Sequence, residues 1–210
     1  VVILGDSVAV GTPNLDHLVS VDAAHFWRNL LAEWIASQWI DLDTGSAFDW
    51  LSWKTYDYFS GKGAKKQSGD FWNCSKWGAR TDDLLEGGGQ IPECFPEGGT
   101  DKTTLIAFTM GGNDISKITQ EGGEASDAEV TAGYPSIWNL AHETIRHLRN
   151  GVIWLKDPER FPNGSFVIFA NPYEFTDGTG EMSACPVASF AGYKPWKKPE
   201  ALEEIVLWLL

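Results

Sequence analysis

Basic residues are scarce in this chain. It carries 16 Lys and Arg against 29 Asp and Glu, a formal net charge of −13 over 210 residues. A protein with this charge balance repels the phosphate backbone of nucleic acids. We therefore exclude nucleic acid as a partner and expect an acidic surface.

Long hydrophobic runs are missing as well, although 43% of the residues are hydrophobic. No segment approaches the roughly 18 consecutive apolar residues that a membrane-spanning helix needs. The length suits one domain with a full core. We expect a single domain over residues 1–210 that is not an integral membrane protein.

Cysteine is rare, with three residues at positions 74, 94 and 185. None has the C-x-x-C spacing of a zinc site or a redox dithiol. One interpretation is an exported domain with a disulfide between Cys74 and Cys94, in which Cys185 has its partner elsewhere. The other is three buried thiols. On the first interpretation we predict an extracytoplasmic or secreted protein, and we expect no metal or other cofactor.

Histidine is equally rare, and none of the four follows position 147. His142 and His147, in the segment HETIRH, resemble the H-E-x-x-H zinc motif but lie one residue too far apart. Five helical steps turn the second ring about 140° from the first, so both cannot face one metal. We interpret this segment as a solvated helix face. For His17 and His25, a surface or helix position and a substitute catalytic base are the two alternatives.

Apolar strands alternate with helical stretches along the chain. Strands are predicted over residues 1–5, 71–75, 104–110 and 165–171. Helices are predicted over 23–40 with a broad apolar face, over 135–152 with Pro135 first and Asn150-Gly151 as the stop, and over 81–89 with Thr81 as the cap. This alternation indicates an α/β fold with a mostly parallel sheet.

Two segments, 41–70 and 86–101, fit the alternation poorly because they are rich in Gly, Asp, Ser and Lys. We expect insertions or loops over the rim of the sheet. Aromatic residues gather at 48–59, where they could line a groove for acyl chains or sugars. The alternative is that they cover the core.

Two of the predicted strands end in polar residues. VVILGDSVAVG breaks at Gly5 and delivers Asp6 and Ser7, and TTLIAFTMGGNDIS ends in Asn113 and Asp114 after two glycines. Parallel strands place such residues on the rim of the sheet, where open α/β folds build their ligand sites.

Three segments together resemble the first three sequence blocks of the SGNH or GDSL hydrolases, in the family's order. They are GDSVAVG (5–11), NCSKWGARTDDL (73–84) with Gly78, and MGGND (110–114). NPYEFTDGTG followed by SACP is similar to extracellular bacterial members and, more distantly, to the catalytic part of acyloxyacyl hydrolases. The resemblance implies a flavodoxin-like three-layer α/β/α sandwich and a serine esterase or lipase.

The resemblance also implies the roles of particular residues. Ser7 would be the nucleophile that forms an acyl-enzyme. The oxyanion donors would be the backbone N–H groups of Ser7 and Gly78 and the side-chain amide of Asn113. A glycine at 78 fits such a role because a side chain there would keep the backbone from the substrate. Asp6 and Asp114 would support the turns, and the substrate would be an acyl-ester small molecule, a lipid or an acylated glycan.

The family takes its catalytic histidine from an Asp-x-x-His motif after a fifth strand, and no histidine follows Cys185. One explanation is that the catalytic Asp and His lie downstream or on a second chain. The uncapped end EEIVLWLL and the odd cysteine favour it, so we expect a fold that is incomplete at the C-terminus and a segment that is nearly inactive alone. The other explanation is a non-catalytic module that binds acylated glycans or lipids.

Overall fold

The computed structural model describes residues 1–10, 27–38, 67–68, 71–170 and 192–209. Within them, five strands form one sheet in the order β2-β3-β1-β4-β5. They are β1 (Val2–Gly5), β2 (Gln67–Ser68), β3 (Phe71–Asn73), β4 (Thr104–Thr109) and β5 (Ser165–Ala170). The four predicted strands are confirmed, and all four run parallel, whereas the short β2 pairs antiparallel with β3.

The first strand of the chain lies in the middle of the sheet. Strand β1 pairs with β3 on one side and with β4 on the other, and all four of its residues are buried. Such a strand is covered on both faces, which explains its uninterrupted apolar sequence. The parallel strands follow the flavodoxin-like order, in which ligands bind where the order reverses, here between β1 and β4.

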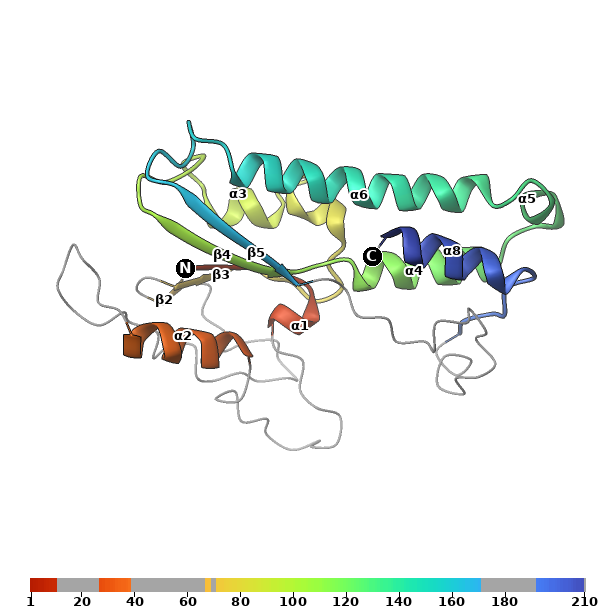
Figure 1. Ribbon diagram of the computed structural model, residues 1–210, viewed down its shortest axis with the longest axis horizontal. Helices are drawn as coiled ribbons and strands as arrows, with labels where there is room; N and C mark the ends of the chain where they lie inside the picture. The colour runs from red at the N-terminus through yellow and green to blue at the C-terminus, as the bar shows by residue number, and fades with distance from the viewer. Residues whose placement is uncertain (11–26, 39–66, 69–70, 171–191, 210) are drawn as a thin grey trace.

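Helices cover both faces of this sheet (Figure 1). They are α1 (Ser7–Val10), α2 (Trp27–Gln38), the 3₁₀ helix η3 (Thr81–Leu84), α3 (Gln90–Cys94), α4 (Gly112–Gly123), α5 (Asp127–Thr131), α6 (Pro135–Leu155) and α8 (Pro199–Leu209). Helices α3 and α6 lie on one face, and α1 and α2 on the other. The predicted α/β flavodoxin-like architecture is confirmed. In the part of the chain described here, no helix combines the length and the apolar character that crossing a membrane requires.

The core has one apolar cluster on each face of the sheet and a third beyond it. The largest lies between the sheet and α3, η3 and α6 and includes Leu4, Leu84 and Phe108. A smaller one, around Ile3 and Ile35, joins the sheet to α2. The third joins α4, α6 and α8, which pack together beyond the strand ends (Figure 1).

Helix α6 begins at Pro135 as predicted, but the predicted stop at Gly151 is wrong. The helix continues to Leu155, and Gly151 lies buried inside it. A Cβ on Gly151 would lie 3.0 Å from Leu84 Cδ1, so this glycine lets α6 approach η3 closely. Glycine in a helix interior marks a close contact here, rather than a C-terminal cap.

Helix α2 lies within the predicted range 23–40, but its apolar face is narrower than the spacing indicated. Ile35 is buried, whereas Leu30 and Trp34 are 49% and 54% exposed. Of the predicted face, Leu31 and Ile35 contact the core, and Phe26 and Trp39 lie outside the described residues.

The segment 86–101 also differs from the prediction, because it contains the helix α3, which packs beside β1. Gln90 and Ile91 on this helix are fully buried. Most of 41–70, including the aromatic residues 48–59, lies outside the described residues, and residues 67–68 form β2.

The disulfide predicted between Cys74 and Cys94 is present, with the two Cα atoms 5.9 Å apart. It joins the end of β3 to the end of α3. The alternative of three buried thiols is therefore wrong for these two residues, and Cys185 lies outside the described residues.

Candidate functional site

Three chain segments meet at the carboxyl ends of the parallel strands. The first segment follows β1, the second follows β3 and the third follows β4. The backbone N–H of Asp6 donates to the carbonyl of Thr109 at 3.1 Å, which joins the first segment to the third. The N–H of Lys76 donates to the carbonyl of Gly5 at 2.9 Å, which joins the second to the first. The side-chain amide of Asn113 donates to the carbonyl of Ala79 at 2.8 Å and closes the triangle. The three sequence blocks therefore form one hydrogen-bonded unit.

Ser7 is the first residue of α1 and is half-buried at this strand end. Gly5, two residues before Ser7, has φ 138°, and a Cβ on it would lie 2.2 Å from the carbonyl oxygen of Thr109. No other residue fits that position without displacing β4. Gly5 thus lets β1 turn directly into α1 and places Ser7 at the rim.

Asp6 caps the short helix α1. Its Oδ1 accepts a hydrogen bond from the N–H of Val8 at 2.9 Å. Burial raises the pKa of Asp6 above its ordinary value of 3.8, and the hydrogen bond from the Val8 N–H opposes this shift. The carboxyl group therefore forms a local helix cap.

Gly78 lies in the turn Lys76–Ala79, which the N–H of Ala79 closes onto the carbonyl of Lys76 at 3.2 Å. Its φ of 71° lies in the left-handed region that the third residue of a type II turn requires. The space that a Cβ would take is open. The backbone conformation of the turn is therefore sufficient reason for glycine at this position.

The segment after β4 touches both other segments. Gly111, with φ 116°, is the N-cap residue of α4, and a Cβ on Gly112 would lie 3.6 Å from Oδ2 of Asp6. The next residue, Asn113, reaches the Ala79 carbonyl, as described above. The segment after β4 therefore contacts the chain after β3 through Asn113 and approaches the segment that carries Ser7 at Gly112.

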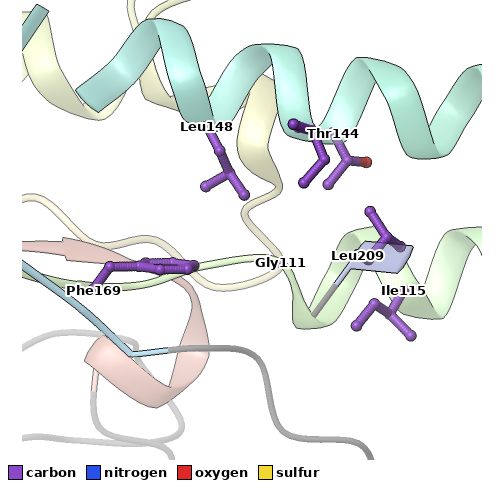
Figure 2. A pocket seen from close by; sticks show the side chains of 7 residues that line it. Gly111, Ile115, Thr144, Leu148, Phe169 and Leu209 are labelled. Atoms are coloured by element: carbon purple, nitrogen blue, oxygen red, sulfur yellow. The ribbon is translucent and has the colours of Figure 1, made fainter. Parts of the chain in front are cut away.

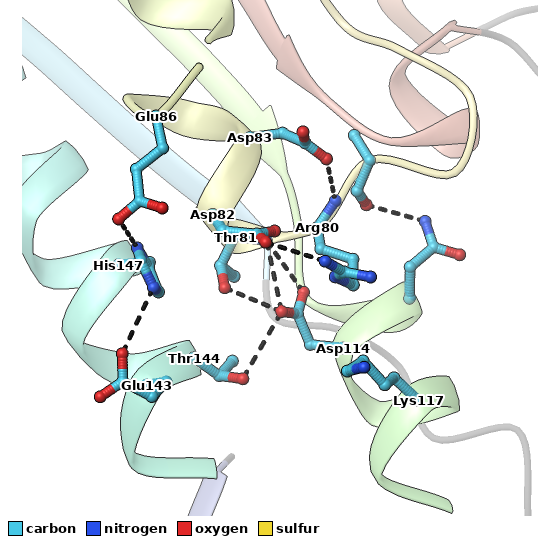
Figure 3. A network of polar contacts seen from close by, with 12 residues as sticks. Arg80, Thr81, Asp82, Asp83, Glu86, Asp114, Lys117, Glu143, Thr144 and His147 are labelled. Atoms are coloured by element: carbon cyan, nitrogen blue, oxygen red, sulfur yellow. Dashed lines mark hydrogen bonds and ion pairs between the residues drawn. The ribbon is translucent and has the colours of Figure 1, made fainter. Parts of the chain in front are cut away.

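Asp114 is the centre of a buried polar network (Figure 3). It accepts hydrogen bonds from the N–H of Thr81 at 3.0 Å and from the Thr81 hydroxyl at 2.8 Å. The Thr144 hydroxyl, which donates to the Leu140 carbonyl at 2.9 Å, lies 3.5 Å from the same carboxyl group. Burial raises the pKa of Asp114, and the two hydrogen bonds from Thr81 oppose this shift. Asp114 thus ties η3, α4 and α6 together.

This network corrects the prediction for Thr81. Arg80 occupies the cap position of η3, and its N–H donates to Oδ2 of Asp83 at 2.9 Å. The hydroxyl of Thr81 turns to Asp114 instead. The sequence reasoning missed Thr81 and Thr144 as supports of the site, because each lies at least 30 residues from Asp114 in the chain.

A polar groove lies beside Asp114 (Figure 3). Arg80 and Asp82 form an ion pair of 2.8 Å on its wall, and the hydrogen bond from Arg80 lowers the pKa of Asp82. Lys117, Glu143 and His147 also line it. Across the described ranges, no three His, Cys, Asp or Glu side chains are grouped so that they could hold a metal ion.

The two histidines of α6 contact different elements. The His142 ring packs against the Trp208 ring of α8, with the ring centroids 4.6 Å apart. Nδ1 of His147 instead lies 3.4 Å from Oε1 of Glu86, which follows η3. The rings therefore point in different directions, as their five-residue spacing predicts, although His147 is only partly exposed. His17 and His25 lie outside the described residues.

An apolar cavity borders the segment after β4 on the side of α6 (Figure 2). Its lining comes from α4, α6, α8 and the ends of β4 and β5, and consists of Gly111, Ile115, Thr144, Ile145, Leu148, Phe169 and Leu209. Gly111 directly precedes Gly112 and Asn113, so the cavity lies next to the candidate site.

Comparisons with known proteins bear on the chain as a whole. No curated protein and no solved structure matches it. One family model does match, and it covers all three segments described above. Because the model of the GDSL-like lipase/acylhydrolase family matches residues 1–177, the chain belongs to that family.

Proposed function

We propose that this protein is a carboxylic ester hydrolase that forms an acyl-enzyme on Ser7. The observation that supports it best is the hydrogen-bonded unit that links the segments of Ser7, Gly78 and Asn113. This unit lies where the strand order reverses, the usual ligand position in such sheets. Family membership supports a hydrolase of the SGNH type in general.

The proposed reaction begins with attack of Ser7 Oγ on the ester carbonyl, while a base removes the hydroxyl proton. The carbonyl oxygen becomes an oxyanion, which accepts hydrogen bonds from the N–H groups of Ser7 and Gly78 and from the amide of Asn113. The tetrahedral intermediate expels the alcohol, which takes the proton. Water then attacks the acyl-enzyme by the same steps and releases the acid.

The side-chain amide of Asn113 suits this role because it has two hydrogens. One is donated to the carbonyl of Ala79. That hydrogen bond fixes the plane of the amide, and the other hydrogen would serve the oxyanion. A donor that is held in place before the reaction stabilises developing charge without reorganisation at the moment of attack.

We propose that the catalytic His and Asp come from outside residues 1–210, because no histidine follows position 147. The contacts of His142 and His147 with Trp208 and Glu86 support this assignment. Loss of the base from a serine triad lowers turnover by about 10⁶-fold. Residues 1–210 alone should therefore hydrolyse esters only at the residual rate that the oxyanion donors supply.

The proposed substrate is an acyl ester, whether a small molecule, a lipid or an acylated glycan. Membership of the GDSL-like lipase/acylhydrolase family supports an acyl ester as the substrate. We further propose an extracytoplasmic or secreted location. The disulfide between Cys74 and Cys94 supports it, because such bonds persist in oxidising compartments.

The test uses the complete natural chain, a short p-nitrophenyl ester and a fluorophosphonate probe. We expect ester hydrolysis and covalent labelling of Ser7, located by peptide mass spectrometry. The Ser7→Ala variant should lose both, because it keeps the fold and removes the nucleophile. If a folded complete chain with a histidine beside Ser7 neither hydrolyses the ester nor takes the probe, the proposal is wrong.

The second candidate is a binding module on the same fold, favoured by the histidine-free C-terminal region. Binding of a fluorescent fatty acyl ester without hydrolysis or labelling would support it. Labelling of Ser7 that a saturating acyl ester slows would support the enzyme.

A further inference from the structure

We propose that Gln90 is a positioning residue for Ser7, an inference that rests on the proposed function. Its side-chain amide is fully buried and binds the backbone of Gly5, two residues before Ser7. Oε1 accepts from the Gly5 N–H at 2.7 Å, and Nε2 donates to the Gly5 carbonyl at 2.8 Å. One side chain therefore satisfies both backbone groups at the end of β1.

The ladder between β1 and β3 explains why a side chain is needed there. The carbonyls of Val1, Ile3 and Gly5 accept in turn from the N–H groups of Trp72, Cys74 and Lys76, at 2.8, 2.9 and 2.9 Å. In a parallel ladder the N–H of Gly5 would bond to the same neighbouring strand. At this rung it binds Gln90 instead.

The chain after β3 stops pairing with β1 because it forms a turn there. Strand β3 ends at Asn73, and after Lys76, which still donates to the Gly5 carbonyl, the chain builds the turn Lys76–Ala79 that contains Gly78. Without Gln90, the departure would leave the N–H of Gly5 buried without an acceptor, which is energetically costly. Gln90 lets β1 stay fixed while the chain beside it forms the proposed oxyanion turn.

Gln90 can fix another residue because its own helix is held at both ends. A Cβ on Gly89, just before it, would lie 2.6 Å from the carbonyl oxygen of Leu84, so the start of α3 packs directly on η3. Cys94 at its other end is joined to Cys74 by the disulfide. Helix α3 thus contacts both parts of the proposed site. Gln90 binds the end of β1, and the disulfide of Cys94 holds Cys74, which precedes the Gly78 turn.

We infer that the amide of Gln90 sets the position of the Ser7 N–H and Oγ relative to the Gly78 turn. A displacement of about 1 Å in a catalytic constellation can lower the rate about 100-fold. Such a displacement affects the transition state more than substrate binding, so kcat should change and KM should change little.

The test compares Gln90→Met with Ile91→Ala in the complete natural chain. Methionine has a similar size but cannot replace the amide's hydrogen bonds to Gly5, whereas Ile91 is equally buried on the same helix and its hydrocarbon side chain cannot hydrogen-bond to any peptide group. For folded protein we expect Gln90→Met to lose about 10- to 100-fold in kcat and in the rate of fluorophosphonate labelling, with KM changed less than about threefold. Ile91→Ala should lower the thermal midpoint and keep both rates.

A second variant decides the outcome if Gln90→Met does not fold. Gln90→Glu keeps the acceptor for the Gly5 N–H, and Lys76 still donates to the Gly5 carbonyl, so its rates should lie between those of the parent and of Gln90→Met. If every Gln90 variant that folds is labelled at the Ile91→Ala rate, the positioning role alone is overturned. A parent chain that takes no label would instead overturn the proposed function.

Discussion

The segments after β1 and β4 use the same local design and differ in what holds them. Each has a strand, then a glycine with positive φ, Gly5 at 138° and Gly111 at 116°. Each has a buried carboxylate, Asp6 or Asp114, whose pKa is raised by burial. Asp6 binds a backbone N–H two residues away, whereas Asp114 binds Thr81, which is 33 residues away.

The difference shows two ways to fix a polar turn at a strand end. The carboxylate of the first turn binds within its own turn, as a helix cap, whereas distant Gln90 and Thr109 hold the backbone of that turn. The second is completed by the chain after β3, through Thr81 and Ala79. Substitutions in the second segment should therefore disturb distant parts of the site, whereas substitution of Asp6 should act locally.

The largest effect is expected for Gly5→Ala. Its Cβ would lie 2.2 Å from the Thr109 carbonyl oxygen, at a φ that side chains rarely adopt. We expect the free energy of unfolding, measured with urea, to fall by about 4 kcal/mol or more. The control Gly133→Ala has φ 84° and open space, so it should lose about 1–2 kcal/mol. Equal losses would show that β4 yields to the added methyl group.

Asn113→Ala tests the segment after β4 through catalysis. If its amide binds the oxyanion, kcat should fall about 10²- to 10³-fold while KM changes little. The matched control is Asn163→Ala, because Asn163 also donates from its amide to a distant carbonyl, that of Asp101 at 2.5 Å. Steady-state kinetics of the complete chain should show the loss for Asn113 alone, and similar kcat values for both variants would contradict the assignment.

The two carboxylates can be compared directly by alanine substitution. Asp114→Ala leaves the N–H and hydroxyl of the buried Thr81 without their acceptor, so we expect a loss of about 2–4 kcal/mol in unfolding free energy. Asp6→Ala removes one helix cap and should cost about 1 kcal/mol. Chemical denaturation at neutral pH measures both, and a larger loss for Asp6 would reverse the distinction drawn here.

The smallest effect is a pH dependence. A carboxyl group whose pKa is raised in the folded state binds its proton more tightly there than in the unfolded chain. Its contribution to stability is full below the ordinary value of 3.8 and is lost as pH rises through the raised folded pKa. The Asp114→Asn variant lacks this titration, so the stability of the parent relative to it should increase as pH falls from about 7 to about 4.

Asp82→Asn is the control for Asp114→Asn, because the pKa of Asp82 is shifted in the opposite direction. The pKa of Asp82 is lowered by Arg80, so its contribution is present above 3.8 and is lost as pH falls through the lower folded pKa. Urea unfolding of the three proteins from about pH 7 to well below pH 3.8 should give differences of opposite sign, with the change for Asp82 beginning below about pH 5. A parallel shift of both variants would contradict the environments described here.

The parts predicted well from sequence are those that neighbouring residues determine. An apolar run that ends in Gly5-Asp6-Ser7 predicted both the strand and the polar turn, and residues 104–110 predicted β4 in the same way. Contacts between distant residues were not predictable. Gln90 lies 85 residues from Gly5, and nothing in its own surroundings distinguishes it from a loop glutamine. Gly151 resembled a helix stop in the sequence. The structure explains this glycine by its close contact with Leu84, which belongs to another helix.

The central place of β1 has a consequence for how the protein is synthesised. Residues 2–5 are synthesised well before their partners in the sheet, residues 72–73 and 106–109. At about 5–20 residues per second, this apolar strand waits roughly 5–20 s before its second neighbour exists. During that interval its apolar surface needs protection by a chaperone or by temporary contacts within the nascent chain.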